Sequence, residues 1–87
     1  MEVLYRRIPL TVDALFYEDG RIMPQKLWYK DRSMEIMRVM GVRRKAPLGV
    51  RSVAPLEYTV LIDGRTRKLY YEADSSCWFT VAESRRE

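Results

Sequence analysis

Residues 56–72 read LEYTVLIDGRTRKLYYE and carry the clearest structural pattern of this chain. Apolar residues alternate with mostly polar ones from Leu56 to Ile62, and a similar alternation follows from Thr66 to Glu72. A period of two is typical of β-strands. Asp63-Gly64, between the two runs, favours a two-residue type I′ turn. The stretch therefore predicts an antiparallel β-hairpin.

The segments on both sides of this hairpin predict further strands, separated by turn residues about every ten positions. Asp19-Gly20 marks a second hairpin turn, and Pro9 predicts a break near the start, because proline cannot donate to a ladder. The last residues, 83–87, predict a frayed polar tail. The other strands are expected at residues 3–8 as an edge strand, 10–17, 22–30 and 77–82.

Residues 34–42 fit two structures. Met34, Ile36, Met40 and Val42 alternate as in a strand, although Arg38 interrupts that face. Methionines at positions 34, 37 and 40 also form a helical row with a spacing of three. The flanking hairpin pattern favours the strand.

These elements predict a mainly antiparallel all-β fold in one domain, residues 1–87. An open flat sheet would leave exposed edges and uncovered apolar side chains. We therefore expect a meander of five or six strands that closes into a small SH3-like or OB-like barrel. The alternative is an α+β fold with a short helix at residues 34–41.

Composition limits the chemistry. The 87 residues include no histidine and one cysteine, Cys77. The chain therefore lacks the commonest general base and a Cys/His zinc site, and its carboxylates are scattered singly. We expect no enzyme activity, no catalytic or metal-binding residue and no cofactor. One cysteine without an export signal favours the cytoplasm, and the absence of a long apolar run argues against a membrane partner.

The net charge of +4 equals the contribution of one segment without acids. Its four cations are Arg43, Arg44, Lys45 and Arg51. Localised positive charge of this kind could contact the phosphates of a nucleic acid. The plainer interpretation is a solvated loop that keeps the protein soluble.

A second group of cations lies beside aromatic residues in and just after the hairpin of residues 56–72. The group comprises Arg65, Arg67, Lys68, Tyr70 and Trp78. Exposed rings between arginines form a surface on which bases can stack. The alternation places Leu69, Tyr71 and Phe79 in the core and leaves Tyr70 and Trp78 outside, where they would cover neighbouring strands if they bind nothing.

The two groups together make a nucleic-acid-associated binding module the first functional hypothesis. The alternative is a protein-interaction or homo-oligomerisation module that uses an exposed sheet edge and an apolar patch around Met37, Val39 and Trp28. A homodimer would be compatible with both hypotheses. The nucleic-acid hypothesis depends on whether the two basic groups share one face.

A longer pattern links several of these elements. It consists of Val12-Asp13-Ala14-Leu15-Phe16, Asp19-Gly20-Arg21-Ile22-Met23-Pro24, Trp28, Arg38-Val39, Tyr70-Tyr71-Glu72 and Trp78-Phe79. This pattern resembles a family of short bacterial all-β proteins of unknown function. Some members are encoded near translesion DNA polymerases, which implies a nucleic-acid context. The shared motifs are turns, edge prolines and aromatic positions, so the resemblance implies no catalytic residues.

Overall fold

The computed structural model describes residues 2–44 and 55–86, and every element in these two segments is a strand. All strand pairs are antiparallel. The all-β prediction is confirmed, and the alternative of a helix at residues 34–41 is wrong. The strands are β1 (Glu2–Phe16), β2 (Ile22–Tyr29), β3 (Arg32–Glu35), β4 (Arg38–Arg44), β5 (Leu56–Ile62), β6 (Arg65–Glu72) and β7 (Cys77–Arg86).

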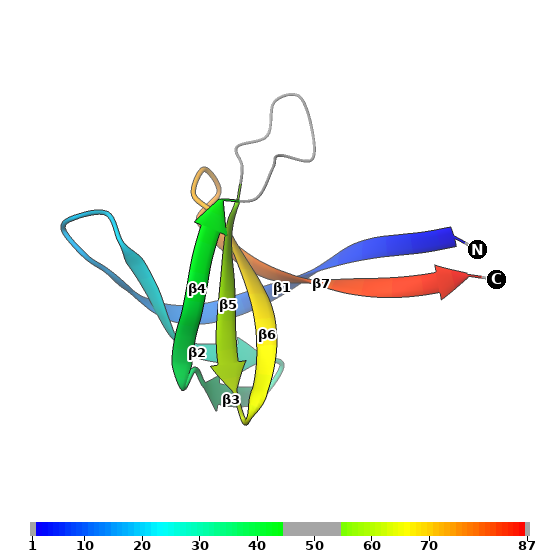
Figure 1. Cartoon of the computed structure of the whole chain (residues 1–87), viewed down its shortest axis with the longest axis horizontal. Coiled ribbons are helices and arrows are strands. Elements are labelled where there is room, and N and C mark those ends of the chain that lie inside the picture. Colours follow the sequence, from blue (N-terminus) through cyan, green and yellow to red (C-terminus); the bar gives the residue numbers. More distant parts are fainter. Residues whose placement is uncertain (1, 45–54, 87) are drawn as a thin grey trace.

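The seven strands form one sheet in the order β3-β2-β1-β7-β6-β5-β4, which curls into a half-barrel (Figure 1). The long strand β1 makes the curl possible because it changes partner along its length. Residues 2–10 pair with β7 and residues 11–16 pair with β2. The predicted break at Pro9 does not occur, since Pro9 lies within β1 opposite Phe79, just before this exchange of partners.

The number of strands differs from the predicted five or six. The segment 34–42 is divided between two strands, because the chain crosses between two parts of the sheet at Ile36 and Met37. The backbone N–H of Ile36 donates to the carbonyl of Gln25 on β2, and that of Met37 donates to Leu61 on β5. The two halves of one predicted strand therefore end up at opposite edges of the sheet.

The core lies on the concave side of the sheet, which we call the inner face; the opposite side is the outer face. Its buried members are Leu27, Tyr58, Val60, Ile62, Leu69, Tyr71 and Trp78. The phenol of Tyr58 on β5 donates a 2.7 Å hydrogen bond to the carbonyl of Ile22 on β2. This bond joins the β5 side of the curled sheet to the β2 side across the core.

The two chain ends form a ribbon that projects from the half-barrel (Figure 1). Here the first residues of β1 pair with the last residues of β7, from Glu2 opposite Arg86 to Arg6 opposite Ala82. Residues 83–86 thus belong to a strand, where the sequence predicted a frayed tail.

Candidate functional site

The structure brings together one member of each predicted basic group at a buried carboxylate. Glu57 on β5 is 2% exposed, and its Oε1 accepts a 2.7 Å hydrogen bond from Nε of Arg43 on β4. The Nζ of Lys68 on β6 lies 3.5 Å from the same oxygen and donates to Thr59 at 2.8 Å. We call Arg43, Glu57 and Lys68 the Glu57 cluster. Its two cations share one face, and the carboxylate between them offsets part of their charge.

Tyr70 extends this outer face toward β7. It lies opposite Glu57 on one side and opposite Phe79 on the other, and its ring stacks on that of Phe79 with centroids 5.3 Å apart. The guanidinium of Arg7 covers the other side of Phe79 at 4.3 Å and forms a 2.7 Å ion pair with Glu72. Phe79 is consequently 5% exposed, and its ring is covered by protein.

Trp78 occupies the inner face, contrary to the predicted position outside the core. It is 7% exposed and packs against Tyr58 and Tyr71, with ring centroids 5.2 and 4.8 Å away. The cause is the register, since β6 and β7 pair Tyr71 with Trp78 and Tyr70 with Phe79. A register that differs by one residue exchanges the two faces of a strand. The expected roles of Trp78 and Phe79 are therefore interchanged.

The other predicted cations do not lie on the surface formed by Arg43 and Lys68, or lie outside the described residues. Arg65 and Arg67 lie opposite Ile62 and Val60, so they belong to the inner face and are separated by the sheet from Lys68. Arg44 lies opposite Leu56 at the end of β4. Lys45 and Arg51 lie outside the described residues. Among the predicted residues that the structure describes, only Arg43, Lys68 and Tyr70 form one contiguous surface.

Two tyrosines, Tyr70 on this surface and Tyr58 on the inner face, have raised pKa values. Burial raises the pKa of Tyr70 above its ordinary value, and its hydrogen bond with the Glu57 carboxylate raises it further. Burial, followed by the proximity of Tyr71, raises the pKa of Tyr58. Both phenols therefore stay protonated at neutral pH and act as hydrogen-bond donors.

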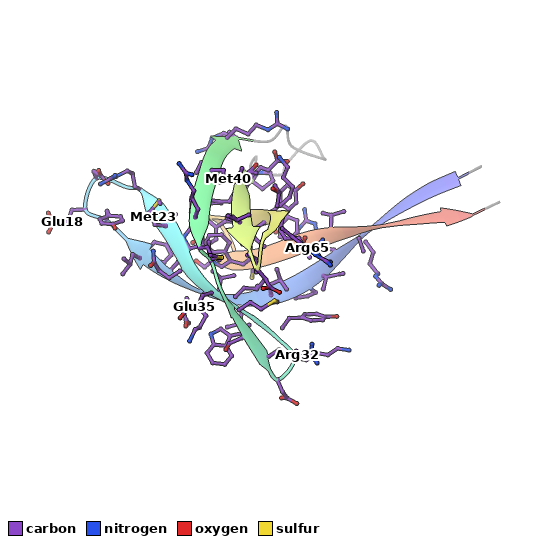
Figure 2. All side chains as sticks on the ribbon, turned by 60° about the horizontal axis from the view of Figure 1, so that its bottom comes forward. Glu18, Met23, Arg32, Glu35, Met40 and Arg65 are labelled. Atoms are coloured by element: carbon purple, nitrogen blue, oxygen red, sulfur yellow. The ribbon has the colours of Figure 1, made fainter. Side chains whose placement is uncertain are left out.

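A different surface is formed by the edge of the sheet at β4. Within the described part of the chain, β5 is the strand to which β4 is hydrogen-bonded. Met40 and Val42 are 54% and 47% exposed, and Figure 2 shows Met40 on β4. We call this exposed edge the edge surface; it carries Arg38 on the outer face, Val42 and Arg44 on the inner face, and Met40 at the irregular position between them. Sequence reasoning missed this set, because which strand ends the sheet depends on the long-range topology.

The predicted apolar patch around Met37, Val39 and Trp28 does not form as one surface. Met37 is exposed, but Val39 lies opposite Val60 and faces the core. Trp28 lies on β2, where its indole N–H donates to Asp13 at 3.0 Å and Lys26 lies 5.3 Å from its ring. The exposed apolar residues of the edge are therefore Met40 and Val42.

Residues 2–44 and 55–86 contain no group of three His, Cys, Asp or Glu side chains placed to hold a metal ion. The same segments contain no helix long and apolar enough to cross a membrane. Comparisons of the chain with protein-family models, curated proteins and solved structures gave no match.

Proposed function

We propose that this protein is a binding module that takes up an extended segment of another protein as an additional strand at β4. Small SH3-like and OB-like barrels present ligand sites on their sheet faces, and we extend that use to the edge of this half-barrel. Strand addition supplies affinity through backbone hydrogen bonds and specificity through alternate side chains.

The position of Val42 is the observation that carries this proposal. Val42 lies opposite Tyr58 and faces the core side of the sheet. Tyr58 is 1% exposed, whereas Val42 is 47% exposed, because β4 is the last strand in the order. An added strand would place a side chain beside Val42 and extend the core by one row. The irregular register at Met40 leaves residues 41–44 as the regular part of this edge.

Charge indicates what kind of segment fits. β4 contains three arginines and no acidic residue, and one of these arginines, Arg43, pairs with Glu57 on the outer face. The opposite edge strand, β3, is only four residues long and carries charges of both signs, Arg32 and Glu35. A short edge strand that carries charges of both signs is a poor template for strand addition. The favoured occupant is therefore a segment in which acidic and apolar residues alternate.

Peptide display can test this specificity directly. A random seven-residue library selected on the full chain should enrich peptides with alternating acidic and apolar residues. A synthetic peptide of the enriched sequence should shift the backbone amide signals of β4 more than those of other strands in an NMR titration. Absence of enrichment, or shifts centred elsewhere, would overturn the proposal.

Two exposed methionines supply matched variants for the same titration. Met40→Glu places a negative charge on the edge, where it would repel the acidic side chains of the favoured segment and oppose strand addition. Met37→Glu introduces the same charge outside β4, at a side chain that is also exposed. We expect Met40→Glu to weaken peptide binding about tenfold, which corresponds to about 1.4 kcal/mol, and Met37→Glu to change it less. Equal losses would contradict docking at the edge.

Nucleic-acid binding is the second proposal, supported by the meeting of Arg43 and Lys68 on one face. Fluorescence anisotropy with generic single- and double-stranded DNA at low and moderate salt tests it. Binding through phosphates should weaken steeply as salt rises. Lys68→Gln should reduce that dependence, whereas Lys30→Gln, an exposed lysine on the β2–β3 turn, should leave it unchanged. No binding at low salt would refute the proposal.

A further inference from the structure

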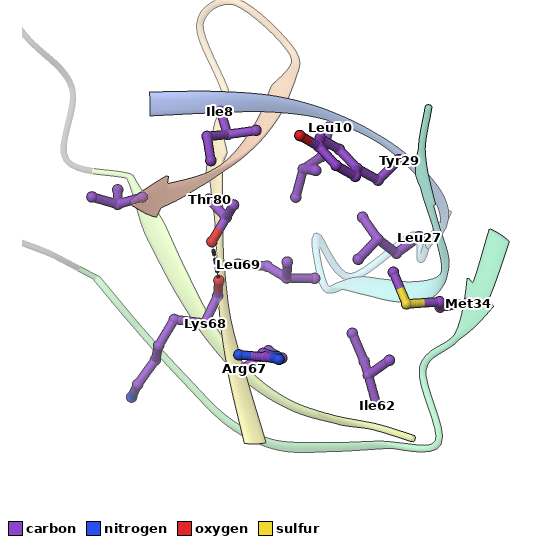
Figure 3. Close-up of a pocket in the computed structure, with 11 residues that line it drawn as sticks. Ile8, Leu10, Leu27, Tyr29, Met34, Ile62, Arg67, Lys68, Leu69 and Thr80 are labelled. Atoms are coloured by element: carbon purple, nitrogen blue, oxygen red, sulfur yellow. Dashed lines mark hydrogen bonds between the residues drawn. The ribbon is translucent and has the colours of Figure 1, made fainter. Parts of the chain in front are cut away.

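A hollow of about 480 Å³ opens on the inner face of the half-barrel. Side chains from β1, β2 and β3 and from β5, β6 and β7 line it, as Figure 3 shows. Most of them are aliphatic, among them Ile8, Leu10, Leu27, Met34, Ile62 and Leu69. Ligand sites typically have volumes of about 300–1,000 Å³ and a predominantly apolar lining. The size and lining of the hollow suit a small ligand.

The hollow exists because the sheet curls without closing. Leu27, Ile62 and Leu69 form a buried floor, while Ile8 and Met34 are half-buried at its sides. The strand order ends at β3 and β4, which are not paired with each other in the described chain, so the half-barrel is open between them. An apolar molecule placed here would remove aliphatic surface from water, at about 25 cal/mol per Å².

Arg67 gives the hollow its polarity. It lines the space from β6 and is solvent-exposed, and within residues 2–44 and 55–86 it has no ion pair or hydrogen bond from its side chain. Lys68 also borders the hollow, but its amine is directed to Thr59 on the outer face, and Figure 3 shows it pointing away. No lining residue is acidic. A guanidinium beside an aliphatic floor is complementary to a carboxylate that carries an aliphatic chain.

We propose that this hollow binds a free aliphatic carboxylic acid in its ionised form. The carboxylate would accept two hydrogen bonds from the Arg67 guanidinium, and the hydrocarbon chain would lie on the floor formed by Leu27, Ile62 and Leu69. The lining contains no aromatic residue except Tyr29, so a flexible chain fits it better than a stacked ring. This site goes beyond strand addition at β4, because no β4 residue lines the hollow.

The test is an NMR titration of the full chain with decanoate, below the concentration at which it forms micelles. Methyl signals of Leu27, Ile62 and Leu69 should shift and saturate. Decanol, which has the same chain without the charge, should bind about tenfold more weakly, and decyltrimethylammonium should bind more weakly still. Equal affinity for the three amphiphiles would show simple partition into an apolar surface and would overturn the proposal.

Arg67→Gln and Arg65→Gln form a matched pair for the same titration. Both arginines are exposed and lie on the inner face of β6, but Arg65 is outside the lining. We expect Arg67→Gln to lower decanoate affinity about tenfold without changing decanol affinity, and Arg65→Gln to have little effect. Equal effects would overturn the proposal. So would methyl shifts that follow protein concentration without ligand, since a second copy would then fill the hollow.

Discussion

Glu57 is the one charged side chain that the structure buries among the residues it describes. Arg43 covers it from an exposed position, so removal of this arginine should cost roughly 1–2 kcal/mol, below the 3–5 kcal/mol of a wholly buried pair. We expect Arg43→Met to lower the urea midpoint and Arg38→Met, on the same strand, to leave it nearly unchanged. In a Glu57→Gln background the effect of Arg43→Met should shrink, because the buried charge is gone. A double-mutant cycle measures this coupling, and additive losses would contradict it.

Tyr58 makes the fold less stable at alkaline pH. The folded state raises its pKa above the ordinary 10.0 by burial and by the proximity of Tyr71. Tyr58 therefore holds its phenol proton more tightly in the folded state than in the unfolded state. The resulting stabilisation of the fold is complete below pH 10 and is lost as pH rises through the folded-state pKa of Tyr58. Tyr58→Phe removes the hydrogen bond to Ile22 and should cost about 1 kcal/mol at pH 7. The difference in the free energy of unfolding between the unsubstituted protein and Tyr58→Phe, measured in urea, should become smaller above pH 10. A difference that stays constant with pH would refute this account.

At the scale of elements, the β5–β6 hairpin was the part most accessible to sequence reasoning. The Asp63-Gly64 turn fixes both its type and its register, since a two-residue loop pairs Ile62 with Arg65. Counting back from this pair places Glu57 opposite Tyr70, so the contact between these residues could have been derived. The turn before β7 spans four residues, from Ala73 to Ser76, and does not set the register in this way. This difference explains why the faces of Trp78 and Phe79 were interchanged.

The same turn allows a test of its backbone geometry. Asp63 and Gly64 have φ values of 50° and 74°, as a type I′ turn requires. The methyl group that Gly64→Ala adds has no neighbouring atom within contact distance, so only the unfavourable backbone conformation opposes the substitution. We expect it to lower the free energy of unfolding by about 1 kcal/mol. Gly41 also has free space around it but no positive φ. Gly41→Ala should therefore leave the thermal midpoint unchanged or raise it. Equal changes in the two midpoints would contradict this account of the turn.

At the scale of the whole molecule, the sequence indicated the strands but not the order in which they assemble. Local alternation says which residues share a face, whereas the sheet edge depends on partners far apart in the chain. β1 shows this best, because its two halves bind β7 and β2, and Pro9 near the exchange suggested a break instead. The edge surface at β4 and the hollow beside Arg67 both result from this order. Neither could be located before the curl of the sheet was known.

The curl itself depends on few contacts between the two ends of the sheet, and Leu27 is central among them. It is the buried hydrophobic residue that β2 contributes to a core otherwise drawn from β5, β6 and β7. Leu27→Ala should cost about 2–5 kcal/mol by loss of burial and cavity formation, a large share of the roughly 5 kcal/mol expected for a small domain. Leu61→Ala removes the same atoms from a half-buried outer position on β5 and should cost less. Hydrogen exchange should show Leu27→Ala releasing β2 and β3 before β5 and β6, because the latter pair keeps its own ladder and core. If Leu61→Ala destabilised the protein as much, or if all strands opened together, the half-barrel would not be held closed at Leu27.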